Sequence, residues 1–210
     1  MKNLIYITLI LVSVTGVAQK SKFTRAILKG KEMLSTADTV TAFISAANYF
    51  ERIKLNEPDE WLPAYYQARA LTVVAMKGDK EKKEEVLNTA LEVVQTAQVI
   101  ERNSELVALE GYVQMLRLTV DPATRGRTLS PVIFKLFNEA LQLDLDNPRA
   151  MIFLGQMEFG TAQFFGSGTE KACGYIEKAA ALFEEESDED TILPMWGAEA
   201  LPYYQENCNQ

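Results

Sequence analysis

The sequence predicts an all-α protein made of about four antiparallel helical hairpins, followed by a C-terminal capping segment. Small and large apolar residues recur with a four-then-three spacing at Ala46/Phe50/Ile53, Ala90/Val94/Ala97, Ile133/Phe137/Ala140 and Ala172/Ile176/Ala179. The intervals between the first members of these groups are 44, 43 and 39 residues, which is typical of helical repeats. Asn147-Pro148 adds a helix-start signal before the last group, because asparagine caps helices and proline suits a first helical turn.

The first half of the chain predicts four helices. Apolar spacing indicates helices over residues 22–34 and 39–55. Asp59 is a candidate cap for a third helix that reaches Lys77, where Gly78-Asp79 interrupts the pattern and Asp79 caps a fourth helix.

The second half predicts four more helices and one long loop. Ser104 opens the fifth helix, and residues 121–130 are expected to form a loop before a sixth helix that starts at Ser130-Pro131. The seventh helix opens at Asn147-Pro148, and the eighth carries the last apolar group. The acidic run 184–190 lacks the ligand spacing of a calcium loop and is expected to be a solvated loop.

The last hairpin resembles the tetratricopeptide repeat (TPR), on the residues Met151, Leu154, Gly155, Ala172, Ile176 and Ala179. Met151 stands where that family usually has tryptophan, and Glu158 where it has tyrosine. The resemblance covers most of residues 22–186 and implies an α-solenoid. A regular TPR recurs at about 34 residues, so the longer units here would be degenerate repeats with extended helices or loops; another helical-hairpin array with a period near 40 is the alternative. It implies helix-packing roles for Ala46, Phe50, Ala90, Ala97, Gly111, Ala140, Gly155, Ala172 and Ala179.

Composition excludes several function classes. The chain has 210 residues, Lys+Arg 21, Asp+Glu 29, no histidine and a formal net charge of -8. The acidic balance repels phosphate backbones, so no nucleic-acid partner is expected. Without histidine the usual general base and the commonest zinc ligand are missing, so we expect no enzyme, no metal and no cofactor.

Residues 1–18 have the features of a secretory signal peptide. Lys2 precedes the apolar run 4–14, and small residues precede Gln19. The run is shorter than the roughly 20 residues of a membrane-spanning helix; a retained membrane anchor is the alternative. We therefore expect cleavage after Ala18, a periplasmic or secreted protein, and no membrane span in the mature chain.

The TPR resemblance also implies a concave groove for a partner. It places six residues on that surface: Tyr65, Arg69, Tyr112, Met115, Gln156 and Phe159. Aromatic and arginine side chains often anchor protein interfaces, so the expected partner is a protein or peptide of unknown identity. The alternative is that these aromatic residues fill the core between repeats.

Arg125 and Arg127 lie in the expected loop 121–130 and form a candidate contact for an anion. Paired arginines suit a carboxylate or sulfate. The alternative is a local salt bridge or a contact with a helix end.

The two cysteines, Cys173 and Cys208, predict a disulfide in an exported protein. The bridge would hold an aromatic tail over the last repeat and cap its apolar flank; two separate thiols are the alternative. The expected organisation is a signal peptide at 1–18, a repeat domain at 19–190 and a cap at 191–210.

The predicted function is a non-enzymatic protein-binding or scaffold module of the periplasm or cell envelope. The alternative is a small-ligand carrier, or an enzyme that uses groove carboxylates such as Glu110 or Glu158. Fold alone does not decide among these functions.

Overall fold

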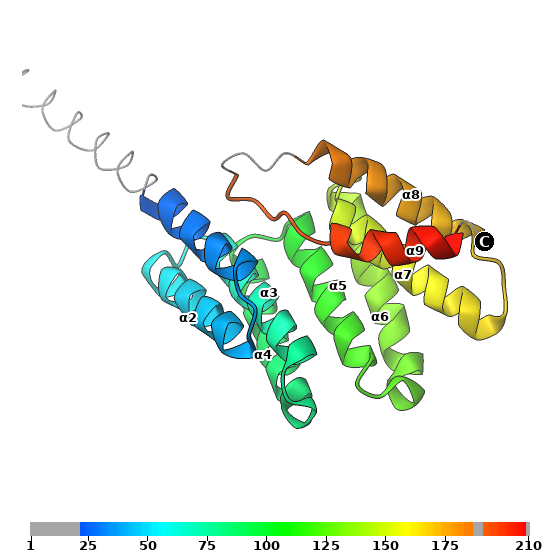
Figure 1. Ribbon diagram of the computed structural model, residues 1–210, viewed down its shortest axis with the longest axis horizontal. Helices are drawn as coiled ribbons and strands as arrows, with labels where there is room; N and C mark the ends of the chain where they lie inside the picture. The colour runs from blue at the N-terminus through cyan, green and yellow to red at the C-terminus, as the bar shows by residue number, and fades with distance from the viewer. Residues whose placement is uncertain (1–21, 187–190, 209–210) are drawn as a thin grey trace, which may run out of the picture.

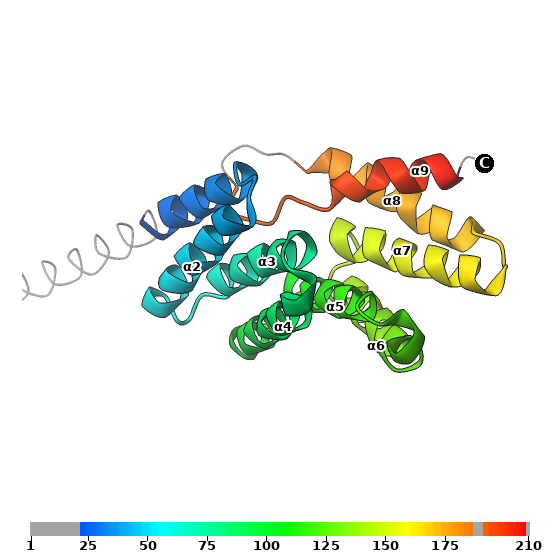
Figure 2. The same cartoon turned by 60° about the horizontal axis from the view of Figure 1, so that its bottom comes forward.

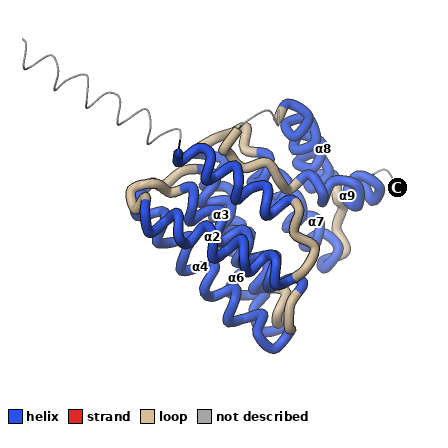
Figure 3. The backbone as a smooth tube through the Cα atoms, turned by 60° about the vertical axis from the view of Figure 1, so that its left-hand side comes forward, coloured by secondary structure: helices blue, strands red, loops and turns tan. Residues whose placement is uncertain are grey.

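The computed structural model describes residues 22–186 and 191–208, and these two ranges form helices, turns and loops without a strand (Figure 3). The prediction of an all-α chain is therefore confirmed for the described residues. A helix over residues 22–35 is followed by α2 (Val40–Asn56), α3 (Leu62–Lys77), α4 (Lys83–Ile100), α5 (Ser104–Leu118), α6 (Pro122–Leu143), α7 (Pro148–Phe165), α8 (Glu170–Glu185) and α9 (Leu201–Cys208). Two short 3-10 turns, η1 (Lys80–Lys82) and η2 (Ala198–Ala200), precede α4 and α9.

The signal peptide expected at residues 1–18 lies outside the described residues. Within the described ranges, every helix is too short or too polar to cross a lipid bilayer.

Consecutive helices pack side by side through most of the chain, from α2 to α8. Contacts between α3 and α5, and between α5 and α7, form an inner row made of alternate helices. Helices α4 and α6 lie on the side of this row opposite α9 (Figure 2). This arrangement of successive hairpins fits the predicted array, and membership of the TPR class itself stays a prediction.

Side-chain caps define where several helices begin. The side chains of Thr39, Asn103 and Asn147 accept hydrogen bonds from backbone amides three residues later, at 3.2, 3.0 and 2.8 Å. These bonds satisfy amides that lack partners in the first helical turn. Asn147 is only 1% exposed, so its cap also lies inside the structure.

Two glycines allow pairs of helices to approach closely. A Cβ atom on Gly111 would lie 2.6 Å from a ring carbon of Phe137, and one on Gly155 would lie 3.0 Å from Cγ1 of Ile176. The other residues expected at helix contacts are also buried, namely Ala46, Phe50, Ala90, Ala97, Ala140, Ala172 and Ala179.

The prediction of a loop at residues 121–130 is wrong, because α6 begins at Pro122 and continues through Pro131. Asp121 caps the helix by accepting from the Thr124 amide at 3.2 Å. Both Asp121-Pro122 and Ser130-Pro131 have the sequence of a helix start, and the structure uses the earlier one. Leu129 packs against the main core and helps hold the added turns.

We expect Gly155→Leu to lower the free energy of unfolding by about 1–3 kcal/mol, because the new side chain would be forced against α8. Gly160→Leu in the same helix is the matched control, since nothing lies within 4 Å of its Cβ position. Chemical denaturation of both variants measures the difference. Equal stability of the two variants would contradict the close α7–α8 contact.

Candidate functional site

A segment between α8 and α9, residues 191–197, lies across the inner row of helices (Figure 1). Lys31 of the first helix donates from Nζ to two carbonyl oxygens of this segment, at 2.6 and 3.1 Å. The hydroxyl of Tyr66, on α3, donates to the Ile192 carbonyl oxygen at 2.8 Å. The array therefore binds the main chain of its own C-terminal segment.

Trp196 fixes the end of this segment against the inner row. Its ring lies 5.3 Å from that of Tyr112 and 5.5 Å from that of Phe153, centroid to centroid. The Arg69 guanidinium lies 4.1 Å from the Trp196 ring centroid, in cation–π geometry. The indole N–H donates to the hydroxyl oxygen of Tyr65 at 2.8 Å, so this amphipathic ring has both apolar and polar partners.

A buried ion network lies next to the Trp196 contact. Arg149, 4% exposed in the first turn of α7, donates to Glu105 of α5 at 2.8–3.0 Å. Its Nη2 lies 2.7 Å from Oε1 of Glu186, at the end of α8, and its Nη1 donates to the Trp196 carbonyl at 3.2 Å. The Asn147 amide also donates to Glu105, at 2.8 Å. The network thus connects α5, α7, the end of α8 and the C-terminal segment.

Burial and charge act in opposite directions in this network. Burial alone would lower the pKa of Arg149, but Glu105, Tyr65 and Glu186 together raise this pKa above its ordinary value, so the guanidinium stays charged. Burial, and then the Glu105 carboxylate, raise the pKa of Tyr65 well above its ordinary value. The Tyr65 hydroxyl therefore stays protonated and donates to Glu105 at 3.0 Å.

Arg149 was not among the site residues predicted from the sequence. The available signal was a charged residue between Pro148 and the apolar run 150–154, in the first turn of a predicted helix. A charged residue next to such an apolar run predicts a buried ion pair, because an isolated buried charge is strongly unfavourable.

A cavity of about 470 Å³ lies between the first helix, α2, α3 and the C-terminal segment. Its apolar lining consists of Leu28, Leu34, Phe43, Val73, Met195 and Trp196. Lys31 and Arg69 also line it with two positive charges, and Glu32 adds one negative charge. The C-terminal segment therefore serves as one wall of the cavity.

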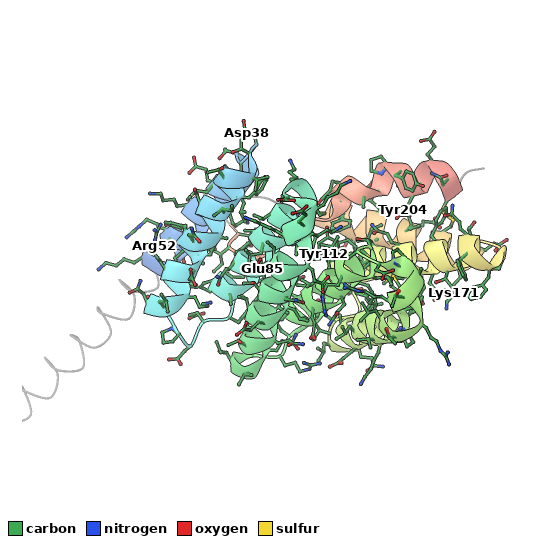
Figure 4. All side chains as sticks on the ribbon, turned by 90° about the horizontal axis from the view of Figure 1, so that it is seen from below. Asp38, Arg52, Glu85, Tyr112, Lys171 and Tyr204 are labelled. Atoms are coloured by element: carbon green, nitrogen blue, oxygen red, sulfur yellow. A yellow bond between two sulfur atoms is a disulfide. The ribbon has the colours of Figure 1, made fainter. Side chains whose placement is uncertain are left out.

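The residues predicted to form an open groove lie on the inner row, but the chain's own C-terminal part covers several of them. Tyr65 is fully buried and Tyr112 is 8% exposed. Phe159 packs edge-to-face against Tyr204 of α9, with centroids 5.4 Å apart. Figure 4 labels Tyr112 among the central helices and Tyr204 on α9.

The remaining groove candidates contribute less to a shared site. Met115 is partly buried against the main core, and Gln156 is half-buried on α7. Of the six predicted groove residues, only Arg69 lines the 470 Å³ cavity.

Arg125 and Arg127 do not form the predicted anion site. Arg125 Nη1 lies 2.6 Å from a carboxylate oxygen of Glu84 and donates to the Arg117 carbonyl at 3.0 Å. Arg117 Nη2 lies 3.3 Å from the other Glu84 oxygen. Arg127 is exposed on α6. Arg125 therefore forms a local salt bridge, which was the alternative prediction for it.

The two carboxylates considered for an enzyme have separate neighbours. Glu110 accepts hydrogen bonds from Gln95 and Gln98 of α4, whereas Glu158 pairs with Lys171 of α8 at 2.5 Å. Neither of them lines the 470 Å³ cavity, so the geometry does not bring them together in that site.

The predicted disulfide is confirmed. Cys173 and Cys208 are bridged with their Cα atoms 5.6 Å apart, which joins α8 to α9. The bridge holds the end of the C-terminal part against the last hairpin.

Glu84→Gln should destabilise the protein at neutral pH by less than about 1 kcal/mol, as is usual for partly exposed ion pairs. Burial alone would raise the pKa of Glu84, but Arg125 and then Arg117 lower it below its ordinary value. Because the pKa of Glu84 is lower in the folded protein than in the unfolded chain, where it is about 4.3, the ionised carboxylate stabilises the fold above that pH. This stabilisation is lost as the pH falls through the pKa of the folded protein. The difference in melting temperature should therefore disappear in acid, and the exposed neighbour variant Glu85→Gln should show no such trend.

Reduction of the disulfide should destabilise the protein by about 3–4 kcal/mol on the chain-entropy model, since the bridge closes a loop with a sequence separation of 35. Hydrogen exchange should rise first in residues 191–208, while the earlier helices stay protected. A reduced protein with unchanged stability and unchanged protection of the C-terminal part would contradict this role for the bridge.

The comparisons with known proteins bear on the fold. No protein-family model matches the chain, and no curated protein sequence matches it. Among solved structures, the chain is similar to the HusA haemophore from Porphyromonas gingivalis, with a TM-score of 0.75 and 24% sequence identity. The match covers 90% of this chain and 92% of that chain. The two proteins therefore share a fold over nearly their whole lengths.

Proposed function

We propose that this chain is an exported carrier of a flat, apolar ligand that bears carboxylates, of the porphyrin type. The 470 Å³ cavity is the observation that carries this proposal. The structural similarity to a protein described as a haemophore supports the same ligand class. A small-ligand carrier was the alternative prediction from the sequence, and it has more support than a protein-binding scaffold.

The size and lining of the cavity suit a small ligand. Ligand pockets commonly enclose about 300–1,000 Å³, with apolar walls and a few polar groups. Here Phe43 and Trp196 supply aromatic surface, and Leu28, Val73 and Met195 supply aliphatic and thioether surface. Such walls would remove the apolar face of a ring system from water, at roughly 25 cal/mol per Å² buried.

Positive charge at the cavity suits the carboxylates of the ligand. The Nη2 of Arg69 pairs with Glu199 at 3.5 Å, whereas its buried Nε has no hydrogen-bond partner among the described residues. A buried donor without a partner is costly, and a ligand carboxylate would supply a charge-assisted hydrogen bond. Lys31 adds a second cation to the same lining, so its two cations exceed the one carboxylate of Glu32.

The cavity offers few side chains that could coordinate the metal ion of a metalloporphyrin. The chain contains no histidine, so imidazole is not available. Burial, and then Glu105, raise the pKa of Tyr66, whose hydroxyl already donates to the Ile192 carbonyl. The thioether of Met195 is the remaining soft donor in the lining. We therefore infer that the face of the ring and its carboxylates provide most of the affinity.

The scaffold interpretation needs an accessible concave surface. Residues 191–197 occupy part of that surface, and they accept hydrogen bonds from Lys31 of the first helix and from Tyr66 of α3. A partner segment would have to displace them, whereas a small ligand would use the cavity beside them.

Leu28→Glu should weaken porphyrin binding by about tenfold or more, because its carboxylate would meet an apolar ring and repel the ligand's own charge. Leu28 is half-buried and lines the cavity, whereas the control Leu55→Glu changes a side chain that is 73% exposed on α2. Quenching of Trp61 and Trp196 fluorescence during titration with haem and with metal-free protoporphyrin measures both affinities.

Both porphyrins should bind the unmodified protein with similar affinity, and Leu55→Glu should leave that affinity unchanged. Equal affinity of the two variants, at unchanged melting temperature, would exclude this cavity as the porphyrin site. Absence of saturable quenching by either porphyrin would reject the ligand class itself.

A further inference from the structure

A second cavity, of about 450 Å³, lies between α4 and α6, away from the C-terminal segment. Figure 2 shows these two helices on the side of the array opposite α9. Its polar lining consists of Gln95, Gln98, Arg102, Glu110, Lys135 and Glu139.

Glu110 of α5 carries negative charge to this cavity. Glu110 is only 9% exposed. One carboxylate oxygen accepts from the Gln95 amide at 2.8 Å, and the other accepts from the Gln98 amide at 2.7 Å. An ionised carboxylate is acceptor-only, and this pair of N–H donors matches that form. Both donors are neutral, so neither of them balances the charge of the carboxylate.

The ion pairs of the described residues leave Glu110 without a counter-charge within 4.0 Å. Buried charges in proteins are normally paired, because burial of an uncompensated charge is costly. Each carboxylate oxygen can also accept more than one hydrogen bond. Glu110 therefore has both unused acceptor capacity and uncompensated charge in a cavity lining.

The two cations of the cavity lining do not fill this role. Arg102 donates from Nε and Nη2 to Glu139 at 2.9 and 2.5 Å, so its charge is balanced there. Its Nη1 donates to the side-chain oxygen of Gln98 and thereby orients that amide toward Glu110. Lys135 is exposed on α6.

Apolar side chains flank the entrance to this cavity. Val99 of α4 is 86% exposed and Val132 of α6 is 42% exposed, and both line the cavity. A carboxylate at depth with apolar groups near solvent matches a ligand that has a cationic head on an aliphatic stem.

We propose that the α4–α6 cavity binds an alkylammonium or alkylguanidinium group, with the cation at Glu110 and the stem between Val99 and Val132. The head forms charge-assisted hydrogen bonds with the carboxylate, and the stem removes apolar surface from water. A free amine and the side chain of a lysine or arginine share this chemistry. The site is independent of the proposed porphyrin cavity, because the two linings have no residue in common.

The probes for this site are pentylamine, amide-capped lysine, amide-capped arginine and amide-capped norleucine, each added to the full-length protein. Norleucine matches the lysine stem but has no charge. NMR spectra of the side-chain amides of Gln95 and Gln98 report binding beside Glu110. We expect saturable shifts with the three cationic probes and none with norleucine.

Glu110→Gln should weaken binding of the cationic probes at least about tenfold, a loss expected for removing the charged partner of a hydrogen bond. Glu158→Gln is the matched control, because it removes a carboxylate that pairs with Lys171 outside this cavity. Val132→Trp tests the entrance without changing Glu110, and it should also weaken binding while the melting temperature is kept.

Tighter binding of capped lysine than of pentylamine would identify a polypeptide as the source of the cation, and the reverse order would identify a free amine. Norleucine binding as strong as lysine binding would overturn the proposal. So would unchanged lysine affinity in both Glu110→Gln and Val132→Trp, or an absence of saturation with every cationic probe.

Discussion

The Arg149–Glu105 ion pair is the interaction on which the arrangement of the inner row depends. It joins α5 to the first turn of α7, and Tyr65 of α3 donates to the same carboxylate. Through the carbonyl of Trp196, Arg149 also holds the C-terminal segment in place. Removal of one partner of a buried pair costs about 3–5 kcal/mol, because the other charge is left without compensation. The packing of three helices, the placement of the C-terminal segment and the shape of the 470 Å³ cavity are therefore linked.

Much of the fold could be predicted from local patterns, because caps and small residues act within one or two helices. Asn147 caps α7, and Gly155 allows α8 to approach, as the sequence suggests. Pro131 misled the prediction, since a proline suits a helix start and the sequence does not show that an earlier start at Asp121 continues through it. The error falls where two similar signals compete.

The candidate site was less predictable, because it depends on contacts between distant parts of the chain. Tyr66 and Ile192 are separated by 126 residues, and their hydrogen bond uses a main-chain oxygen that every residue possesses. No residue pattern in the C-terminal segment marks such a contact. The groove residues Tyr65, Tyr112 and Phe159 are buried, as their alternative interpretation expected. The sequence placed the aromatic tail over the last repeat, but it did not predict that residues 191–197 also contact α3 and α5.

The first part of the C-terminal segment is held through main-chain atoms, so its position does not depend on which side chains it carries. Lys31 and Tyr66 hold carbonyl oxygens, so substitutions at residues 191–193 leave these hydrogen bonds available. Gly197, with φ of 110°, turns the chain toward α9 at a position that favours glycine. The start of the segment, including the cavity-lining Thr191, is thus held at its backbone, whereas Trp196 is held through its side chain. Substitutions at residues 191–193 would therefore be able to change the surface beside the cavity while the path of the main chain stays constant.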